Sequence, residues 1–216
     1  MVKAVFFDLD GTLLDTVHDI RAHLNATLRL FGYPELTLES TKAYIGDGAA
    51  NLVRRALPDG EEGAFEKCFS EFGNRYANSD GALIKIFPGV KGFLNRQKEQ
   101  GRILAVITNK PQGAVDVCMR RFFPEEPFAF VSGESGLFPR KPDPSLTRYA
   151  ALTLRVAPRE CVFVGDGETD VLTARNAGMR GIAALWGYRS REQLAAAGAR
   201  EFVSSFEELE KLLEGA

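Results

Sequence analysis

The sequence has few cysteines, few histidines and no long apolar stretch. Its 216 residues include three cysteines, which is an odd number. These cysteines lie far apart in the sequence and outside any C-x-x-C pair, so we expect reduced, mostly buried thiols. No run of about eighteen apolar residues is present that could span a bilayer. Asp8 and Asp10 interrupt the N-terminal apolar run, which excludes an ordinary signal peptide and predicts a cytoplasmic protein.

The sequence also lacks an excess of charge of either sign. Its 27 lysines and arginines and 29 aspartates and glutamates give a net charge of -2 at pH 7. No positive field is available to attract nucleic acid, so neither nucleic acid nor a membrane is an expected partner. The length allows one large domain or two unequal ones with a proper core, and the sequence does not indicate an oligomeric state.

Short β-rich apolar runs alternate with longer amphipathic segments along most of the chain. The runs are apolar throughout, which is typical of strands covered on both faces. They occupy residues 3–7, 103–108, 128–132, 161–165 and 181–185, and the helical segments occupy residues 90–100, 113–123, 145–154 and 168–178. This alternation predicts an α/β fold, a doubly wound parallel sheet with helices on both faces.

One interval, from about residue 15 to residue 87, shows helical patterns but no convincing strand. Because the connection after a strand usually takes about 2 to 6 residues, a segment of this length must fold by itself. We therefore expect residues 15–86 to form a small α-helical domain inserted into a core made of residues 1–14 and 87–216.

The first apolar run ends in FFDLDGTL, where Asp8 and Asp10 follow a strand that should be buried. Two neighbouring buried carboxylates are costly unless a cation or a reaction needs them. In open parallel sheets, ligands bind beyond the carboxyl ends of the strands, so the residues at those ends are the candidates. They are Asp8, Asp10, Gly11, Thr12, Thr108, Asn109, Lys110, Lys141, Pro142, Asp166, Gly167, Glu168 and Asp170.

These residue types indicate a magnesium site beside a phosphate site. Mg²⁺ prefers oxygen ligands and usually takes one or two carboxylates together with a substrate phosphate. It would neutralise Asp8 and Asp166 and reduce their repulsion of an incoming anion. Lys141 and the Thr108 hydroxyl can hold phosphoryl oxygens, and Asn109 lies at the positive end of the following helix. A carboxylate can also act as the covalent nucleophile in such chemistry.

The motifs FFDLDGTLLDT, ITN, RKPDP and FVGDGETDVLTARNAG, in this order, resemble the four signature motifs of the haloacid dehalogenase-like (HAD) phosphohydrolases. The resemblance implies a Rossmann-like core and a reaction in two steps. Asp8 would attack phosphorus and form an aspartyl-phosphate while Asp10 protonates the leaving oxygen. Asp10 would then take a proton from the water that hydrolyses this intermediate.

The same resemblance implies the ligands of the metal and of the phosphoryl group. The side chains of Asp8 and Asp166 and the backbone carbonyl of Asp10 would bind Mg²⁺. Asp170 would complete or orient that metal shell, either directly or through water. Thr108 and Lys141 would bind the phosphoryl group. Gly167 departs from the motif, which often has serine there, but the carboxylates of Asp166 and Asp170 remain.

The resemblance also accounts for the helical insert, since many family members carry a cap there that closes over the site and selects the substrate. The stretch AYIGDGAANLVRRAL resembles that of phosphoglycolate phosphatases, which implies 2-phosphoglycolate as the substrate. Arg55, or its neighbour Arg54, would pair with a substrate carboxylate, unless both lie on a solvated helix face. His18 would reach the substrate or be an ordinary exposed or packed histidine.

Several alternatives share these motifs. A sugar-phosphate mutase resembling β-phosphoglucomutase would use the same loops, and nucleotide monophosphates, sugar phosphates and pyrophosphate are further phosphatase substrates to consider. A phosphorylation-dependent receiver domain also combines an acidic cluster, Mg²⁺, threonine and lysine on a doubly wound sheet. Receiver domains, however, have about half this length and no cap. Asp10, as a base beside the nucleophile, favours rapid hydrolysis over a lasting signal.

Overall fold

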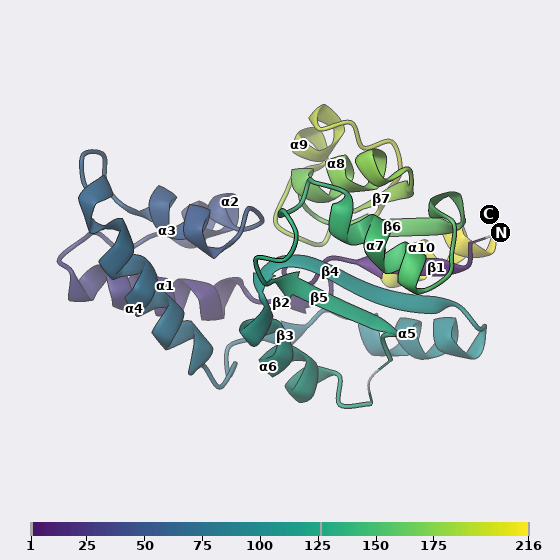
Figure 1. Ribbon diagram of the computed structural model, residues 1–216, viewed down its shortest axis with the longest axis horizontal. Coiled ribbons are helices and arrows are strands. Elements are labelled where there is room, and N and C mark those ends of the chain that lie inside the picture. The colour runs from purple at the N-terminus through teal and green to yellow at the C-terminus, as the bar shows by residue number, and fades with distance from the viewer. Residues whose placement is uncertain (1, 126, 216) are drawn as a thin grey trace.

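The computed structural model describes residues 2–125 and 127–215, and these form a parallel sheet covered by helices, with a separate group of helices at one end (Figure 1). The main sheet has six parallel strands in the order β5-β4-β1-β6-β7-β8. They are β1 (Ala4–Phe7), β4 (Ile103–Pro111), β5 (Phe130–Glu134), β6 (Cys161–Gly165), β7 (Arg180–Ala184) and β8 (Phe202–Val203). The predicted fold class is confirmed.

Strand β1 lies between β4 and β6, and its four side chains are fully buried. Phe7 is in register with Val106 of β4 and with Val164 of β6. The three strands therefore end at the same edge of the sheet. This register is what brings polar residues that are far apart in the sequence to one place.

Both faces of the sheet are covered, as its continuous apolar strands require. One core cluster contains Phe7 and packs against α5 (Val90–Glu99), α6 (Gln112–Phe122) and α10 (Phe206–Glu214). The other contains Phe6 and packs against α7 (Ser145–Thr153) and α8 (Glu168–Ala177). The remaining helices of this part are α9 (Arg191–Ala196) and the short 3₁₀ helix Pro158–Glu160.

The helical group gathers at the end of the molecule opposite the two termini (Figure 1). It consists of α1 (Val17–Leu30), α2 (Leu38–Tyr44), α3 (Ala49–Ala56), a 3₁₀ turn (Glu62–Ala64) and α4 (Phe65–Ala77). These helices share a hydrophobic cluster that includes Leu24, Leu28, Val53 and Phe72. The group thus has an apolar core of its own. None of the helices in the described residues combines the length and the apolar character needed to cross a membrane.

A two-stranded antiparallel ribbon joins the helical group to the rest of the chain. It pairs β2 (Leu14–Asp15) with β3 (Lys85–Ile86). The expectation that the interval from residue 15 to residue 87 contains no strand is therefore wrong at its two ends, because a pair of two-residue strands leaves no periodic pattern to recognise. The ribbon lies where the chain was predicted to divide into core and inserted domain, a division that stays a prediction.

We predict that the helical group depends on its own core for stability. Leu24 of α1 is fully buried, whereas Leu30 of the same helix is 58% exposed. Leu24→Ala should lower the free energy of unfolding by about 2 to 5 kcal/mol, because it leaves a cavity, and Leu30→Ala by less than about 0.5 kcal/mol. Urea unfolding followed by circular dichroism measures both, and equal losses would contradict the assignment.

Candidate active site

The carboxyl edge of β1, β4 and β6 carries a cluster of buried polar side chains. The structure brings together the predicted catalytic, metal-binding and phosphate-binding residues of this part of the chain. They are Asp8, Asp10, Thr108, Asn109, Lys141, Asp166 and Asp170, and all but the partly buried Asp10 are buried. Buried polar side chains require hydrogen-bond or ion-pair partners, and most of those in this cluster find such partners among the neighbouring residues.

Three of the carboxylates form a potential cation site. Asp8, Asp166 and Asp170 each place an oxygen within 4.8 Å of oxygens of the other two. Burial, together with the charges of Asp170 and Asp8, raises the pKa of Asp166 to about 8. One buried oxygen of Asp8, Oδ1, lies 2.9 Å from the Lys141 ammonium. An all-oxygen donor set under such mutual repulsion fits a hard divalent cation.

Asp166 is held in position from two sides. It accepts hydrogen bonds from the Thr12 hydroxyl at 2.9 Å and from the Tyr188 backbone N–H at 2.8 Å. Two glycines make room for it. A Cβ atom added at Gly11, whose φ is +84°, or at Gly187 would lie 2.2 Å from an atom of the Asp166 side chain. Neither position tolerates a side chain while Asp166 stays in place.

Lys141 supplies positive charge to the acidic cluster. Its Nζ lies 2.9 Å from Asp8 Oδ1 and 2.6 Å from Asp170 Oδ1. Burial by itself lowers the pKa of Lys141, but the carboxylates of Asp170 and Asp8 outweigh it and raise that pKa above its usual value. Lys141 therefore stays charged. Asp170 also accepts a hydrogen bond of 2.9 Å from the Gly167 N–H at the start of α8.

Asp10 belongs to a second buried ion pair. Lys110 Nζ donates to Asp10 Oδ1 at 2.7 Å and also to the Tyr76 hydroxyl of α4. Burial by itself lowers the pKa of the Lys110 ammonium. The opposing effects of Asp10 and Tyr76 are larger together, so the pKa lies well above its usual value. Lys110 was expected at this edge from its position in the sequence, but without a role, and Tyr76 was not predicted. Strand β4 extends beyond the predicted residue 108 to Pro111, and this extension directs Lys110 inward.

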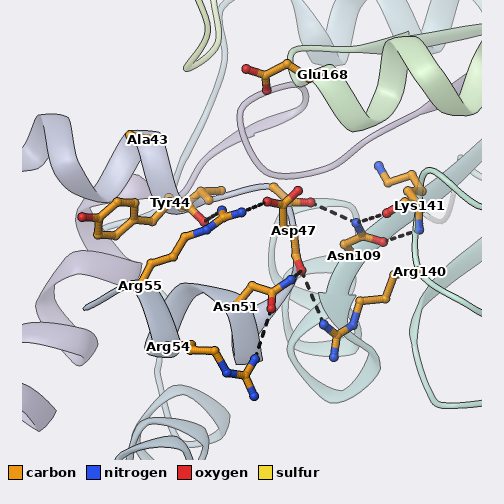
Figure 2. A network of polar contacts seen from close by, with 12 residues as sticks. Ala43, Tyr44, Asp47, Asn51, Arg54, Arg55, Asn109, Arg140, Lys141 and Glu168 are labelled. Atoms are coloured by element: carbon orange, nitrogen blue, oxygen red, sulfur yellow. Dashed lines mark hydrogen bonds and ion pairs between the residues drawn. The ribbon is translucent and has the colours of Figure 1, made fainter. Parts of the chain in front are cut away.

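Asn109 connects Lys141 to the helical group (Figure 2). Its side chain accepts a hydrogen bond from the Lys141 N–H at 2.8 Å and donates to the Lys141 carbonyl at 3.1 Å. It also donates to the Gly46 carbonyl, in the loop after α2, at 2.9 Å. In this structure the Asn109 amide thus positions backbone on both sides of the site. Its predicted contact with phosphate stays a prediction.

Arg189 holds the end of α2 against the sheet, and sequence reasoning missed it. Its guanidinium donates to the carbonyls of Lys42 at 2.6 Å, Ala43 at 3.2 Å and Ile45 at 2.7 Å. Its Nε pairs with Glu168 at 2.8 Å. Cations are favourable at helix C-termini, where carbonyls have no partner within the helix. No local motif marks such an arginine, because its carbonyl partners lie more than 140 residues away in the sequence.

Arg54, Arg55 and His18 lie apart from the carboxylate cluster. Arg55 pairs with the Asp47 carboxylate and donates to the Tyr44 carbonyl at 3.4 Å (Figure 2). Arg54 lies over the Phe65 ring, 4.2 Å from its centroid, and His18 is exposed. None of the three is among the described residues that line the pocket above Asp8. Their contact with substrate stays a prediction.

A pocket that is open to solvent lies between the helical group and the sheet edge. Its floor consists of residues that follow β1 and of residues at the end of β4, and its other walls come from the helices and from the loop after α2. The lining residues are Asp8, Asp10, Ile20, Ile45, Gly46, Gly48, Ala49, Leu52, Phe72, Tyr76, Thr108, Asn109, Lys110 and Pro111. A small molecule held here would contact both parts of the chain.

The chain is similar in sequence to known proteins. A family profile described as haloacid dehalogenase-like hydrolase matches residues 5–184. The chain is 37% identical over 187 residues to the phosphoglycolate phosphatase of Xanthomonas campestris pv. campestris strain 8004, covering 87% of this chain and 85% of that protein. It is 36% identical over 200 residues to phosphoglycolate phosphatase 1 of Pseudomonas aeruginosa PAO1, and this match covers 89% of this chain and 73% of that protein.

Solved structures agree in fold. A crystal structure from Lactobacillus delbrueckii subsp. bulgaricus matches with a TM-score of 0.91 at 32% identity, covering 98% of each chain. That of a predicted phosphoglycolate phosphatase from Haemophilus somnus 129PT matches with a TM-score of 0.89 at 28% identity, also covering 98% of each. The chain therefore belongs to the haloacid dehalogenase-like hydrolases, which confirms the predicted family and the predicted class of enzyme, a phosphatase.

Proposed function

We propose that this phosphatase hydrolyses a small phosphomonoester with the help of Mg²⁺, through an aspartyl-phosphate on Asp8, and that 2-phosphoglycolate is its substrate. The observation that carries the proposal is the position of Asp8. It lies on the floor of the pocket, within the carboxylate cluster, and 2.9 Å from the Lys141 ammonium. A nucleophile, a cation site and a fixed positive charge thus meet where a phosphoryl group can enter.

In the first step, an oxygen of Asp8 forms a bond to phosphorus while the bond from phosphorus to the leaving oxygen breaks. Lys141 and the Thr108 hydroxyl bind the phosphoryl oxygens, which carry the developing charge. Asp10, which also lines the pocket, gives its proton to the leaving oxygen. In the second step, water attacks the phosphoryl group, Asp10 takes the proton from that water, and Asp8 is regenerated as phosphate leaves.

The carboxylate cluster would hold the metal. Asp8 and Asp166 are the proposed direct ligands, with the backbone carbonyl of Asp10, and Asp170 completes or orients the set. Bound Mg²⁺ supplies charge that neutralises the carboxylates and the phosphoryl oxygens. Lys141 already contacts Asp8 and Asp170 and so leaves Asp166 as the carboxylate in greatest need of a cation.

Two further points support the proposal. The relatives at 36% and 37% identity are named phosphoglycolate phosphatases, and the coverage extends over most of both proteins. The three cysteines are buried and free, which suits the reducing cytoplasm that we propose as its location. The helical group, in contact with the site through the pocket, is proposed to act as the cap that selects the substrate.

We predict that Asp8→Asn abolishes phosphate release. The amide is isosteric but a poor nucleophile, so kcat should fall by at least about 10³-fold, while the melting temperature stays close to that of the wild type. Phosphate release from 2-phosphoglycolate measures this. Asp59→Asn, at an exposed position, is the matched control. Undiminished turnover in Asp8→Asn would refute the covalent mechanism.

We also predict that Mg²⁺ stabilises the protein through Asp166. At a Mg²⁺ concentration about 100 times its dissociation constant, binding adds about 2.7 kcal/mol, which raises the melting temperature by about 5 °C or more. Asp166→Asn should lose most of this shift, and Asp59→Asn should retain it. Differential scanning fluorimetry with Mg²⁺ or EDTA gives the comparison, and a full shift in Asp166→Asn would exclude Asp166 as a ligand.

A further inference from the structure

The pocket above Asp8 contains an ammonium group that the proposed hydrolysis does not use. Among the described residues that line this pocket, Lys110 alone carries a positive charge. Its side chain is 1% exposed, and a buried charge of this kind is costly unless it is paired. Asp10 and the Tyr76 hydroxyl are its partners. Lys110 is thus a buried cation at the edge of a space that a ligand can enter.

The other walls of the pocket favour a short ligand with few hydroxyl groups. Ile20, Ile45, Leu52 and Phe72 face it from the helical group, and none of these side chains can form a hydrogen bond. A sugar phosphate would leave several hydroxyls without partners against these side chains, at a cost for each. A short molecule with one further charged group would meet Lys110 and Tyr76 instead.

We propose that Lys110 and Tyr76 bind a second anionic group of the substrate, a carboxylate attached directly to the carbon that bears the ester oxygen, and that this group replaces Asp10 on the Lys110 ammonium. The inference rests on the proposed phosphatase function and specifies its substrate class. In that reaction Asp10 faces the leaving oxygen, and Lys110 Nζ is 2.7 Å from Asp10. When a single carbon separates the leaving oxygen from a carboxylate, that carboxylate therefore falls within reach of Lys110.

The exchange of partners links recognition to catalysis. A substrate carboxylate accepts hydrogen bonds from the Lys110 ammonium and from the Tyr76 hydroxyl, so the ammonium stays paired when Asp10 leaves it. Asp10 is then free to turn toward the leaving oxygen. A phosphomonoester that lacks the second anion leaves Asp10 on Lys110. Such a substrate should have a lower kcat as well as a weaker affinity, because its missing contact with Lys110 is needed to bring Asp10 to the leaving oxygen.

The test compares 2-phosphoglycolate with ethyl phosphate, which has no carboxylate, in the full-length protein. The wild type should prefer 2-phosphoglycolate by about 100-fold or more in kcat/KM, with part of the difference in kcat. Lys110→Met should reduce this preference to less than about 10-fold, mainly through its loss on 2-phosphoglycolate. The exposed Lys91→Met removes the same charge elsewhere and should keep the wild-type preference. Thermal unfolding shows that each variant is folded.

Tyr76→Phe keeps the buried ring, removes the hydroxyl, and provides a second variant if Lys110→Met does not fold. It should reduce the preference by about 5- to 10-fold. Arg55→Met tests the competing carboxylate partner predicted from the sequence, and it should leave the preference intact.

Three results would overturn the inference while leaving the phosphatase function in place. Equal losses on both substrates in Lys110→Met would mean that Lys110 only positions Asp10. A preference lost in Arg55→Met but kept in Lys110→Met would assign the carboxylate to Arg55. A wild type that hydrolyses ethyl phosphate as well as 2-phosphoglycolate would show that no second anion is recognised. Hydrolysis of neither substrate would instead overturn the proposed function itself.

Discussion

The burial of several carboxylates at one edge of the sheet is the constraint on which the rest of this structure depends. Asp8, Asp166 and Asp170 repel one another in a place where water cannot screen them. Lys141 offsets part of this repulsion, and hydrogen bonds to Asp166 and Asp170 offset more. In the proposed reaction, the repulsion that remains uncompensated would favour binding of a cation and, with the cation bound, of a phosphate.

The helical group is tied to this edge mainly through backbone atoms. Arg189, Asn109 and Arg140 all donate to carbonyl groups of residues 42–47, the end of α2 and the loop that follows it. Carbonyl contacts fix the path of that loop and leave its side chains free to differ. The same loop contributes Ile45, Gly46 and Gly48 to the pocket, so the core holds in place the segment that would touch a substrate.

The sequence allowed the sheet and the carboxylate cluster to be predicted because their signals are local. The predicted strands are continuous apolar runs, and Asp8 and Asp166 directly follow two of them, so the topology alone brings these two residues together. Strand β8 has only two residues and was not predicted. The partners of those residues were beyond such reasoning. Tyr76, Tyr188 and Arg189 come from segments with no motif. Their contacts with Lys110, Thr16 and Lys42, respectively, depend on how the helical group sits against the sheet. Helix α2, polar and short, offered little periodicity.

Asp10 occupies the point where the site and the joint of the helical group meet. The turn that carries it closes at once into β2, since the Gly11 N–H donates to the Leu14 carbonyl at 2.8 Å and Leu14 pairs with Ile86 of β3. Tyr188 connects the same two regions, with its backbone N–H on Asp166 and its hydroxyl accepting from the Thr16 N–H at 2.8 Å. A rotation of the helical group about the ribbon would therefore act on Asp10 through its own turn and through Tyr76 and Lys110. If the helical group acts as the proposed cap, the residue that moves the proton in the proposed reaction is thus well placed to respond to its movement.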